Sequence, residues 1–431
     1  MKSGSWRPLL EGDLAARARE AVGAIAEAVR TVPPPESLNE WVQTVREATL
    51  ASGKPGMALL FGYLALGGGP DSERWLELTE SCLDEAVEAL SQVPMMPGLY
   101  SGFISVAWAA EHLDRVMGAE EEPGEDPNEE IDQELLAILA PSPWTGHYDL
   151  ISGLVGFGVY AVERLPRPTA VQCLETIVDR LEEMAVPQAP GITWHSPVEL
   201  IAPHLRESMP QGYYNLGVAH GVPGVIALLA EACRAGVRVE TARPLLDGAV
   251  RWLLAQRRPD DGSSCFATWI SPGVEPRPSR LAWCYGDAGV AASLLVAARA
   301  VGEDAWEREA LDIAARSTRI PREASGIVDP GLCHGAVGLG HLYNRIYQAT
   351  GEELFADTAR FWFSEGLDMR RPDAGVAGFS AWDSSLGEAA QWVDEPGFLT
   401  GATGVGLALL AATSGIEPEW DRVLLVTVPP R

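Results

Sequence analysis

Two kinds of hydrophobic pattern alternate along the chain. Residues 225–230 and 290–295 are apolar and small nearly all round, which is typical of a helix buried on every side. Other segments carry charges on one face and Leu, Ile, Trp or Phe on the other, as amphipathic helices do: 73–90, 169–184, 241–256 and 352–365. The alternation predicts pairs of an inner, buried helix and an outer, half-exposed helix.

A short phrase precedes each apolar stretch. It consists of a glycine, two residues and a second small residue, and its first glycine recurs at positions 53, 102, 153, 221, 286, 335 and 401. The separations of 49, 51, 68, 65, 49 and 66 residues leave room for two helices and two loops each. The first glycine suits a tight entry into the inner helix, and the second small residue permits close backbone approach. The sequence therefore predicts seven helical hairpins.

The hairpins define an all-α fold. Because wholly buried inner helices need cover on all sides, we expect a double-layered ring, an α,α-toroid, formed by a single domain over residues 1–431. The alternative is an open solenoid, which needs polar capping repeats. The last repeat instead continues with the apolar run 406–410. This ending favours the ring.

Two stretches do not follow the repeated pattern of helical hairpins. Residues 118–132 are strongly acidic, which predicts a solvated loop. Residues 187–217 combine prolines with Trp194, Tyr213 and Tyr214. This stretch is expected to be a long loop, either lining a substrate entrance or serving as a plain connection.

Composition narrows the class of protein. Hydrophobic residues make up 47% of the chain and charged residues 21%, which indicates a globular protein with a large core. The formal charge of −28 disfavours nucleic acid and anionic membrane surfaces as partners. The start lacks the apolar core of a signal peptide, and no apolar run of about 18 residues follows. We expect a soluble, cytoplasmic protein whose six dispersed cysteines are free thiols.

Reading equivalent positions around the repeats brings reactive residues together. The residue before each phrase glycine is, in order, Ser52, Ser101, Ser152, His220, Tyr285, His334 and Thr400. One position earlier stand Ala51, Tyr100, Ile151, Ala219, Cys284, Cys333 and Leu399. The two cysteines are therefore equivalent residues of neighbouring repeats, and His334 adjoins the second.

Two sulfurs and one imidazole form the ligand set of a catalytic zinc site with an open fourth position. No fourth protein ligand stands out, since His341 lies inside the following helix. Taken singly, Cys284 and Cys333 could be buried small side chains and His334 a helix-cap residue. Their shared repeat positions favour one zinc per chain instead. Two thiolates on the metal suit the recruitment of a further, substrate thiolate as nucleophile.

A carbon electrophile attacked by sulfur develops enolate charge, so such a site also needs a proton donor and a cation. His220 is the predicted donor, and Arg280, four residues before Cys284, is the predicted cation. Asp149 could orient His220, and Tyr285 could donate a hydrogen bond. For these last two residues, a surface or packing role is an open alternative.

Three motifs carry a resemblance to a known family: Ala219-His220-Gly221, Trp283-Cys284-Tyr285-Gly286 and Cys333-His334-Gly335. With the seven phrases, they make the chain similar to the lanthionine synthetase C-like proteins, especially the stand-alone cyclases of class I lanthipeptide pathways. The resemblance covers nearly the whole chain. It implies an α,α-toroid with zinc on Cys284, Cys333 and His334, and a catalytic group consisting of His220, Asp149, Arg280 and Tyr285.

The activity implied by this resemblance is the addition of peptide cysteine thiolates to dehydroalanine or dehydrobutyrine, which forms (methyl)lanthionine thioether rings. The implied partners are a dehydrated precursor peptide with leader and core, a separate dehydratase and a transporter. Two rivals share the zinc chemistry: a glutathione- or protein-binding adaptor of the same family, and a thiol prenyltransferase-like enzyme, which needs a basic diphosphate pocket. A glycosidase on a similar toroid would need paired carboxylates and no Cys/Cys/His trio.

Overall fold

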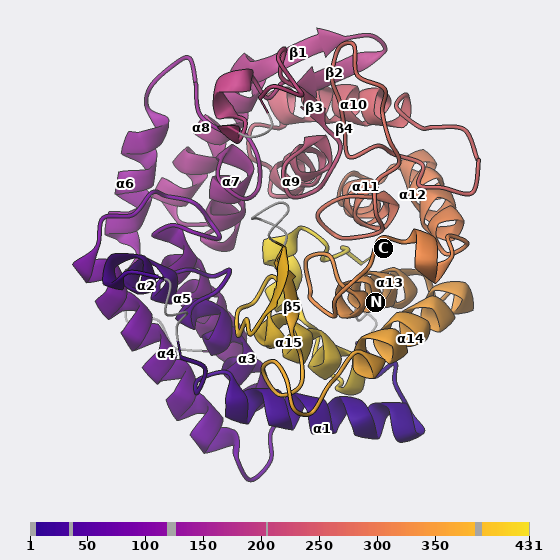
Figure 1. The fold of residues 1–431 in the computed structure, drawn as a ribbon. Helices are drawn as coiled ribbons and strands as arrows, with labels where there is room; N and C mark the ends of the chain where they lie inside the picture. Colours follow the sequence, from indigo (N-terminus) through magenta and orange to yellow (C-terminus); the bar gives the residue numbers. More distant parts are fainter. Residues whose placement is uncertain (1–5, 34–37, 119–125, 204–205, 384–389, 431) are drawn as a thin grey trace. The chain divides into compact units, whose positions relative to one another are not determined.

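The computed structural model describes residues 6–33, 38–118, 126–203, 206–383 and 390–430, and it divides into two compact units. The first unit comprises Met1–Gly124 and Ile327–Trp420, and the second unit comprises Glu125–Gly326 and Asp421–Arg431. Helices dominate both units (Figure 1). The strands in the described residues are short and pair two by two, so all-α architecture is confirmed.

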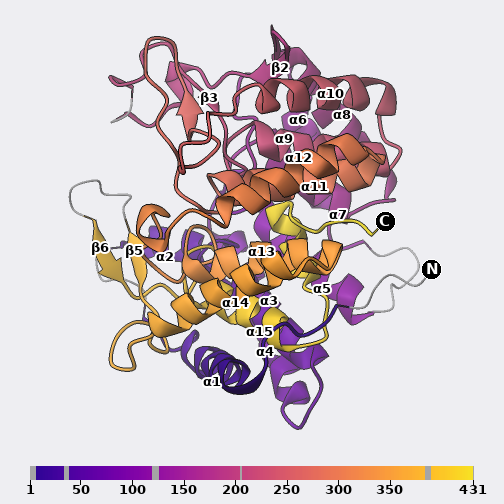
Figure 2. The ribbon, with the colours of Figure 1, turned by 90° about the vertical axis from the view of Figure 1, so that its right-hand side faces the viewer.

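The first unit contains four of the predicted inner helices. Its elements are α1 (Gly12–Ala28), α2 (Glu40–Glu47), α3 (Lys54–Leu66), α4 (Ser72–Gln92), α5 (Ile104–Met117), α13 (Ala336–Thr350), α14 (Glu353–Asp368), β5 (Ala381–Asp383), β6 (Gln391–Val393) and α15 (Ala402–Thr413). The inner helices contact one another in the order α5, α3, α15 and α13. Helix α4 packs on α3 and α14 on α13, while the β5–β6 hairpin projects beyond them (Figure 2).

The second unit repeats this arrangement. Its elements are α6 (Glu129–Leu139), α7 (Leu154–Glu163), α8 (Pro168–Met184), β1 (Ala185–Gln188), β2 (Gly191–Trp194), β3 (Tyr214–Asn215), α9 (Val222–Arg234), α10 (Val239–Leu254), β4 (Trp269–Ile270), α11 (Asp287–Val301) and α12 (Asp304–Ser317). The inner helices α7, α9 and α11 follow one another side by side, and α8, α10 and α12 pack on them as outer helices.

The glycine phrases mark the starts of the inner helices, as predicted. Helices α3, α7, α9, α11, α13 and α15 each begin directly after the first glycine of a phrase, and α5 begins two residues after it. Gly221 shows why a side chain is excluded there: an added Cβ would lie only 2.3 Å from the carbonyl oxygen of Asn215. The four predicted outer helices also form, as α4, α8, α10 and α14.

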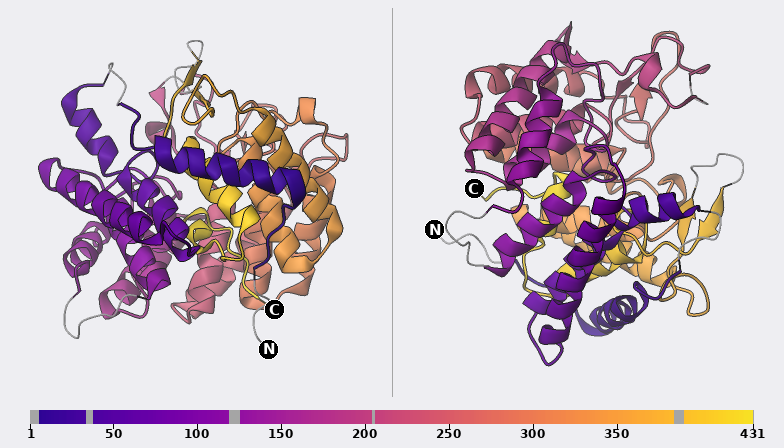
Figure 3. Two further views of the ribbon diagram at one scale, coloured as in Figure 1. Left: turned by 90° about the horizontal axis from the view of Figure 1, so that it is seen from below. Right: turned by 90° about the vertical axis from the view of Figure 1, so that its left-hand side faces the viewer.

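The seventh inner helix has an outer partner from the other end of the chain. Helix α1 lies across α15, which the left view of Figure 3 shows in indigo and yellow. The N–H groups of Leu9 and Leu10 both donate to the carbonyl of Ala412, at 2.9 and 3.0 Å, and the indole N–H of Trp6 donates to the carbonyl of Ala411 at 2.8 Å. The sequence pattern did not reveal this pairing of α1 with α15.

Backbone hydrogen bonds in the first unit link the equivalent positions that contain Cys333. The N–H of Cys333 donates to the carbonyl of Leu399 at 2.7 Å, and the N–H of Leu399 donates to the carbonyl of Ala51 at 3.1 Å. The N–H of Ala51 then donates to the carbonyl of Tyr100 at 3.0 Å. Each bond joins the residue two places before one phrase glycine to the corresponding residue of another repeat. Positions that are equivalent in the repeated sequence are therefore also equivalent in the structure.

Two loop predictions need correction. The acidic stretch 118–132 is not a solvated loop from Asp126 onward, because α6 begins at Glu129 and Asp132 is fully buried; residues 119–125 lie outside the described part. The stretch 187–217 is not a plain loop either. It contains the end of β1, β2 and β3, and β2 packs on α10. Trp194 is fully buried, and its indole N–H donates to the carbonyl of Leu181 at 2.9 Å.

Among the described residues, there is no helix of the length and apolar character that a membrane crossing requires.

Candidate active site

His220 and Asp149 form a hydrogen-bonded pair in the second unit. His220 directly precedes Gly221, the N-cap of α9, and Asp149 lies in the turn before α7. The Nδ1 of His220 lies 2.6 Å from the Oδ2 of Asp149, while the backbone N–H of Ser152 donates to Oδ1 at 2.8 Å. Because a carboxylate only accepts, Nδ1 carries the hydrogen, and Nε2 is the nitrogen left for proton transfer. The prediction that Asp149 reaches His220 agrees with this geometry.

The electrostatics favour a protonated imidazole. Burial by itself favours the neutral ring, but the hydrogen bond and negative charge of Asp149 outweigh it and raise the pKa of His220 above its ordinary value. The side chain of Asp149 is only 10% exposed, whereas that of His220 is 38% exposed. A shielded carboxylate thus supports an imidazole that solvent or a substrate can reach.

Tyr285 and Cys284 lie against the segment that leads to His220. The N–H of Ala219 donates to the carbonyl of Cys284 at 3.4 Å, and the rings of His220 and Tyr285 lie with their centroids 6.1 Å apart at an interplanar angle of 26°. Gly217 permits this approach, since an added Cβ would lie 2.2 Å from the Cys284 carbonyl oxygen. His220 and Tyr285, which occupy equivalent positions in neighbouring repeats, are therefore adjacent in the second unit, as the sequence predicted.

The Tyr285 hydroxyl is held in its protonated form. Burial, and secondarily the charges of neighbouring groups, raise the pKa of Tyr285 well above its ordinary value. The Nδ2 of Asn215 lies 3.4 Å from the Tyr285 hydroxyl oxygen, within hydrogen-bond distance. A neutral phenol close to His220 can donate a hydrogen bond to an oxygen that develops negative charge.

Arg280 stands apart from this group in its contacts. It precedes Cys284 by four residues, and its backbone is closely packed, since an added Cβ on Gly286 would lie 2.0 Å from the Arg280 carbonyl oxygen. Within the described part of the chain, Arg280 forms no hydrogen bond or ion pair with His220, Asp149 or Tyr285. Its predicted role as a cation stays a prediction.

Cys333 and His334 belong to the first unit, directly before Gly335 and α13. The Nε2 of His334 lies 3.6 Å from the Oδ2 of Asp329, whose side chain is fully buried. Asp329 is fixed in place by the backbone N–H groups of Gly331 and Trp382, each donating at 3.0 Å. Of the two ring nitrogens of His334, Nε2 is therefore the one that faces the carboxylate, and Nδ1 lies on the other side of the ring.

His341 lies inside helix α13, as the sequence indicated, and does not adjoin the phrase glycine as His334 does. It is buried within α13 and stacks on Trp420, with ring centroids 4.8 Å apart. This packing against an indole is that of a core side chain.

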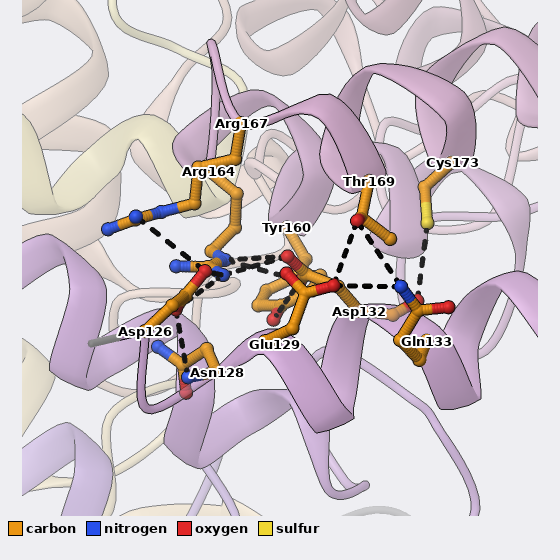
Figure 4. A network of polar contacts seen from close by, with 10 residues as sticks. All are labelled: Asp126, Asn128, Glu129, Asp132, Gln133, Tyr160, Arg164, Arg167, Thr169 and Cys173. Carbon is orange, nitrogen blue, oxygen red and sulfur yellow. Dashed lines mark hydrogen bonds and ion pairs between the residues drawn. The ribbon is translucent and has the colours of Figure 1, made fainter. Parts of the chain in front are cut away.

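A second cluster of acidic side chains, Asp126, Glu129 and Asp132, lies at the start of α6 (Figure 4). Their oxygens lie within 4.8 Å of one another. Arg164, whose side chain is fully buried, forms ion pairs with Asp126 at 2.6 Å and with Asp132 at 2.7 Å. The Tyr160 hydroxyl donates to Asp132 at 2.6 Å. Arg167 adds a second positive charge 3.6 Å from Asp126, and Glu129 accepts hydrogen bonds from Gln133 and Thr169. The three carboxylates thus have protein partners, and the cluster is a polar network that joins α6 to α7.

A comparison of sequences decides the family. The sequence model of the family described as lanthionine synthetase C-like protein matches residues 44–425, which include all seven glycine phrases and every predicted site residue. The chain belongs to the lanthionine synthetase C-like family. The resemblance read from the three motifs is thereby confirmed.

A solved structure shows the same fold. Nisin cyclase matches with a TM-score of 0.71 and 20% identity, over 96% of this chain and 98% of that chain. The predicted fold class, an α,α-toroid, is confirmed by this match. An unsaturated glucuronyl hydrolase from Streptococcus agalactiae (TM-score 0.47, 12% identity, 96% of this chain and 95% of that chain) is less similar. So is a sugar epimerase from a ruminal bacterium (TM-score 0.45, 10% identity, 92% and 98%).

Two polar residues that each contact a predicted site residue escaped the sequence analysis. Asn215 and Asp329 each stand six residues before a phrase glycine, the same repeat position as Arg280. In both, a side-chain oxygen accepts from the backbone N–H two residues later, which turns the chain toward the inner helix. Extending the comparison of equivalent positions to this place in the repeat would have found them.

Proposed function

We propose that this chain is a lanthipeptide cyclase, which adds peptide cysteine thiolates to dehydroalanine or dehydrobutyrine and so forms (methyl)lanthionine rings. The observation that carries the proposal is the Asp149–His220 pair beside Tyr285 and Cys284, in a chain of this family. The pair supplies a proton donor of raised pKa, and Tyr285 supplies a neutral hydrogen-bond donor. An addition that ends in protonation of an enolate needs both functions.

A zinc ion held by Cys284, Cys333 and His334 is part of this proposal. Two sulfurs and one imidazole are donors that zinc prefers, and three protein ligands leave one position for a substrate. The buried Asp329 beside His334 supports the assignment, because metal-binding imidazoles are commonly oriented by a carboxylate on the other ring nitrogen. Zinc bound there would stabilise the thiolate form of the substrate cysteine, which is the nucleophilic form.

The residues of the chain then carry out the remaining steps. The substrate sulfur forms a bond to the β-carbon of the dehydroamino acid, and the electrons of the carbon–carbon double bond move onto the carbonyl oxygen as an enolate. Tyr285 donates a hydrogen bond to that oxygen, and Arg280 supplies positive charge near it. His220 delivers a proton from Nε2 to the α-carbon, while Asp149 holds Nδ1–H. The thiol proton leaves to solvent when the thiolate forms, and the α-carbon gains one proton from His220, which solvent then reprotonates. Substrate and product therefore have the same mass.

The position of Asp329 makes a separate prediction about metal affinity. Asp329→Asn should lower zinc affinity by about 10- to 100-fold, because a ligand imidazole loses the carboxylate that orients it. Competition with a chromophoric chelator measures this without any assay of activity. Glu395→Gln is the matched control, since Glu395 caps the backbone N–H of Gly397 in the equivalent turn. Equal affinities of the Asp329→Asn variant and the control would remove Asp329 from the metal site.

The activity is tested with a dehydrated precursor peptide that contains cysteine. The zinc-loaded protein is expected to convert it into a product of unchanged mass whose thiols no longer react with an alkylating reagent. Mass spectrometry before and after alkylation measures the loss of thiols. Because uncatalysed addition also consumes thiols slowly, the rate and stereochemistry are compared with zinc-stripped protein.

The rival activities give different results in the same experiment. If no dehydrated precursor loses thiols faster than with zinc-stripped protein, the cyclase proposal is wrong. Tight binding of glutathione would then indicate the adaptor, and consumption of an isoprenoid diphosphate would indicate the prenyltransferase-like enzyme.

The proposed function also defines the setting in which the protein works. The reaction starts from dehydrated serine and threonine residues, so we propose a separate dehydratase as partner and a transporter for the finished peptide. We further propose that the protein acts in the cytoplasm, on a precursor consisting of a leader and a core.

A further inference from the structure

Asn215 is a buried polar residue that the proposed mechanism does not yet use. It is 1% exposed and ends the short strand β3, where it pairs with Trp269 of β4. Its backbone is closely confined, because an added Cβ on Gly221 would lie 2.3 Å from the Asn215 carbonyl oxygen and 2.8 Å from its Oδ1. The side chain therefore packs closely against Gly221, the glycine that follows His220.

The hydrogen bonds of Asn215 determine which way its amide faces. Oδ1 accepts from the backbone N–H of Gly217 at 2.9 Å, and only the oxygen of the amide can do so. Nδ2 must then face the Tyr285 hydroxyl, 3.4 Å away. Tyr213, two residues before Asn215 in the chain, is a second tyrosine near this segment. The amide oxygen and one amide N–H thus both have partners.

This orientation decides what the Tyr285 hydroxyl can do. Because Asn215 donates to the phenol oxygen, that oxygen is the acceptor of the bond, and its own hydrogen points elsewhere. We propose that Asn215 is a positioning residue which keeps the Tyr285 hydrogen directed at the substrate. The proposal rests on the cyclase function proposed above, and it assigns the donor that faces the enolate oxygen. An acceptor in place of the amide N–H would draw the Tyr285 hydrogen toward itself and away from the substrate.

The substitution Asn215→Asp tests this directly. The carboxylate has nearly the same shape and still accepts from Gly217, but it has no N–H, so Tyr285 must donate to it. We expect kcat for ring formation to fall by about 10²-fold, the loss typical when one preorganised donor is removed. The KM for the dehydrated peptide and the bound zinc are expected to stay unchanged. A purely structural role for Asn215 would change stability and would not produce this split.

A double-mutant cycle shows whether the effect passes through Tyr285. In the Tyr285→Phe background, Asn215→Asp is expected to lower kcat no further, since the hydroxyl is already absent. In the Tyr213→Phe background, which serves as the matched control, the full decrease is expected. Thermal unfolding of each variant monitors the fold, and Asn215→Ala, which also lacks the N–H donor, replaces the aspartate variant in the cycle if that variant unfolds.

The outcomes separate this inference from the proposed function. If the wild-type protein forms no rings, the proposed function fails and the role of Asn215 fails with it. If the wild-type protein forms rings but the Asn215 and Tyr285 substitutions multiply independently, the positioning role alone is overturned. An Asn215→Asp variant with wild-type kcat overturns it as well.

Discussion

The Cys284→Ala variant is expected to be purified without zinc, whereas the wild-type protein should carry one zinc per chain. Removing one of three protein ligands leaves too few donors for tight binding, and it also removes a negative charge from the site. The fold should be retained, because the backbone carbonyl of Cys284, which accepts from the N–H of Ala219, persists in alanine. Elemental analysis of the purified proteins measures the metal content. Ring formation should be lost together with the zinc.

Cys265→Ala is the matched control for this experiment. Cys265 is a fully buried cysteine of the same unit, and burial raises its pKa to about 12, so it stays a neutral thiol. Its removal should leave the zinc content at one per chain. If the Cys284→Ala, Cys333→Ala and His334→Ala variants all keep full zinc, or if the wild-type protein has none, the proposed metal site is wrong.

The second large effect is expected at His220. His220→Asn should keep the fold and the zinc but slow ring formation by about 10² to 10⁴, the usual contribution of general acid–base catalysis. The reason is the arrangement of the imidazole. The Nδ1 of His220 donates to the Oδ2 of Asp149, 2.6 Å away, and Nε2 is the nitrogen that delivers the proton. The rate of thiol loss from a dehydrated peptide measures the effect, alongside the metal content of the same preparation.

His195→Asn separates this effect from the general loss of an imidazole. His195 lies in the same unit, and its Nε2 contacts the carbonyl oxygen of Gln211 and has no contact with Asp149. The control should cyclise at the wild-type rate. Unchanged cyclisation by His220→Asn would remove His220 from the mechanism, and loss of zinc in that variant would assign His220 to the metal instead.

The sequence by itself determined the helical hairpins and the starts of the inner helices. The information is local, because an apolar run after a glycine phrase specifies a buried helix and its entry whatever surrounds it. Comparing equivalent positions also placed His220 next to Tyr285, and Asp149 within reach of it, since a repeated unit puts the same position at the same place in every copy. The hydrogen bonds from Ala219 to Cys284 and from Cys333 to Leu399 follow this rule.

Only the tertiary structure decided the features that depend on distant partners. Helix α1 packs on α15, but the hydrophobic pattern of α1 does not predict this partner. An amphipathic face indicates that a helix is buried on one side, but it does not indicate which surface covers that side. Asp132 lies in a run of acidic residues, a pattern that predicts a solvent-exposed segment. It is nevertheless buried, because Arg164, 32 residues later in the chain, forms an ion pair with it. Asn215 orients Tyr285 only when two segments 70 residues apart come together. A hydrogen bond depends on distance and angle between its two partners, and for residues this far apart in the chain only the folded structure sets them.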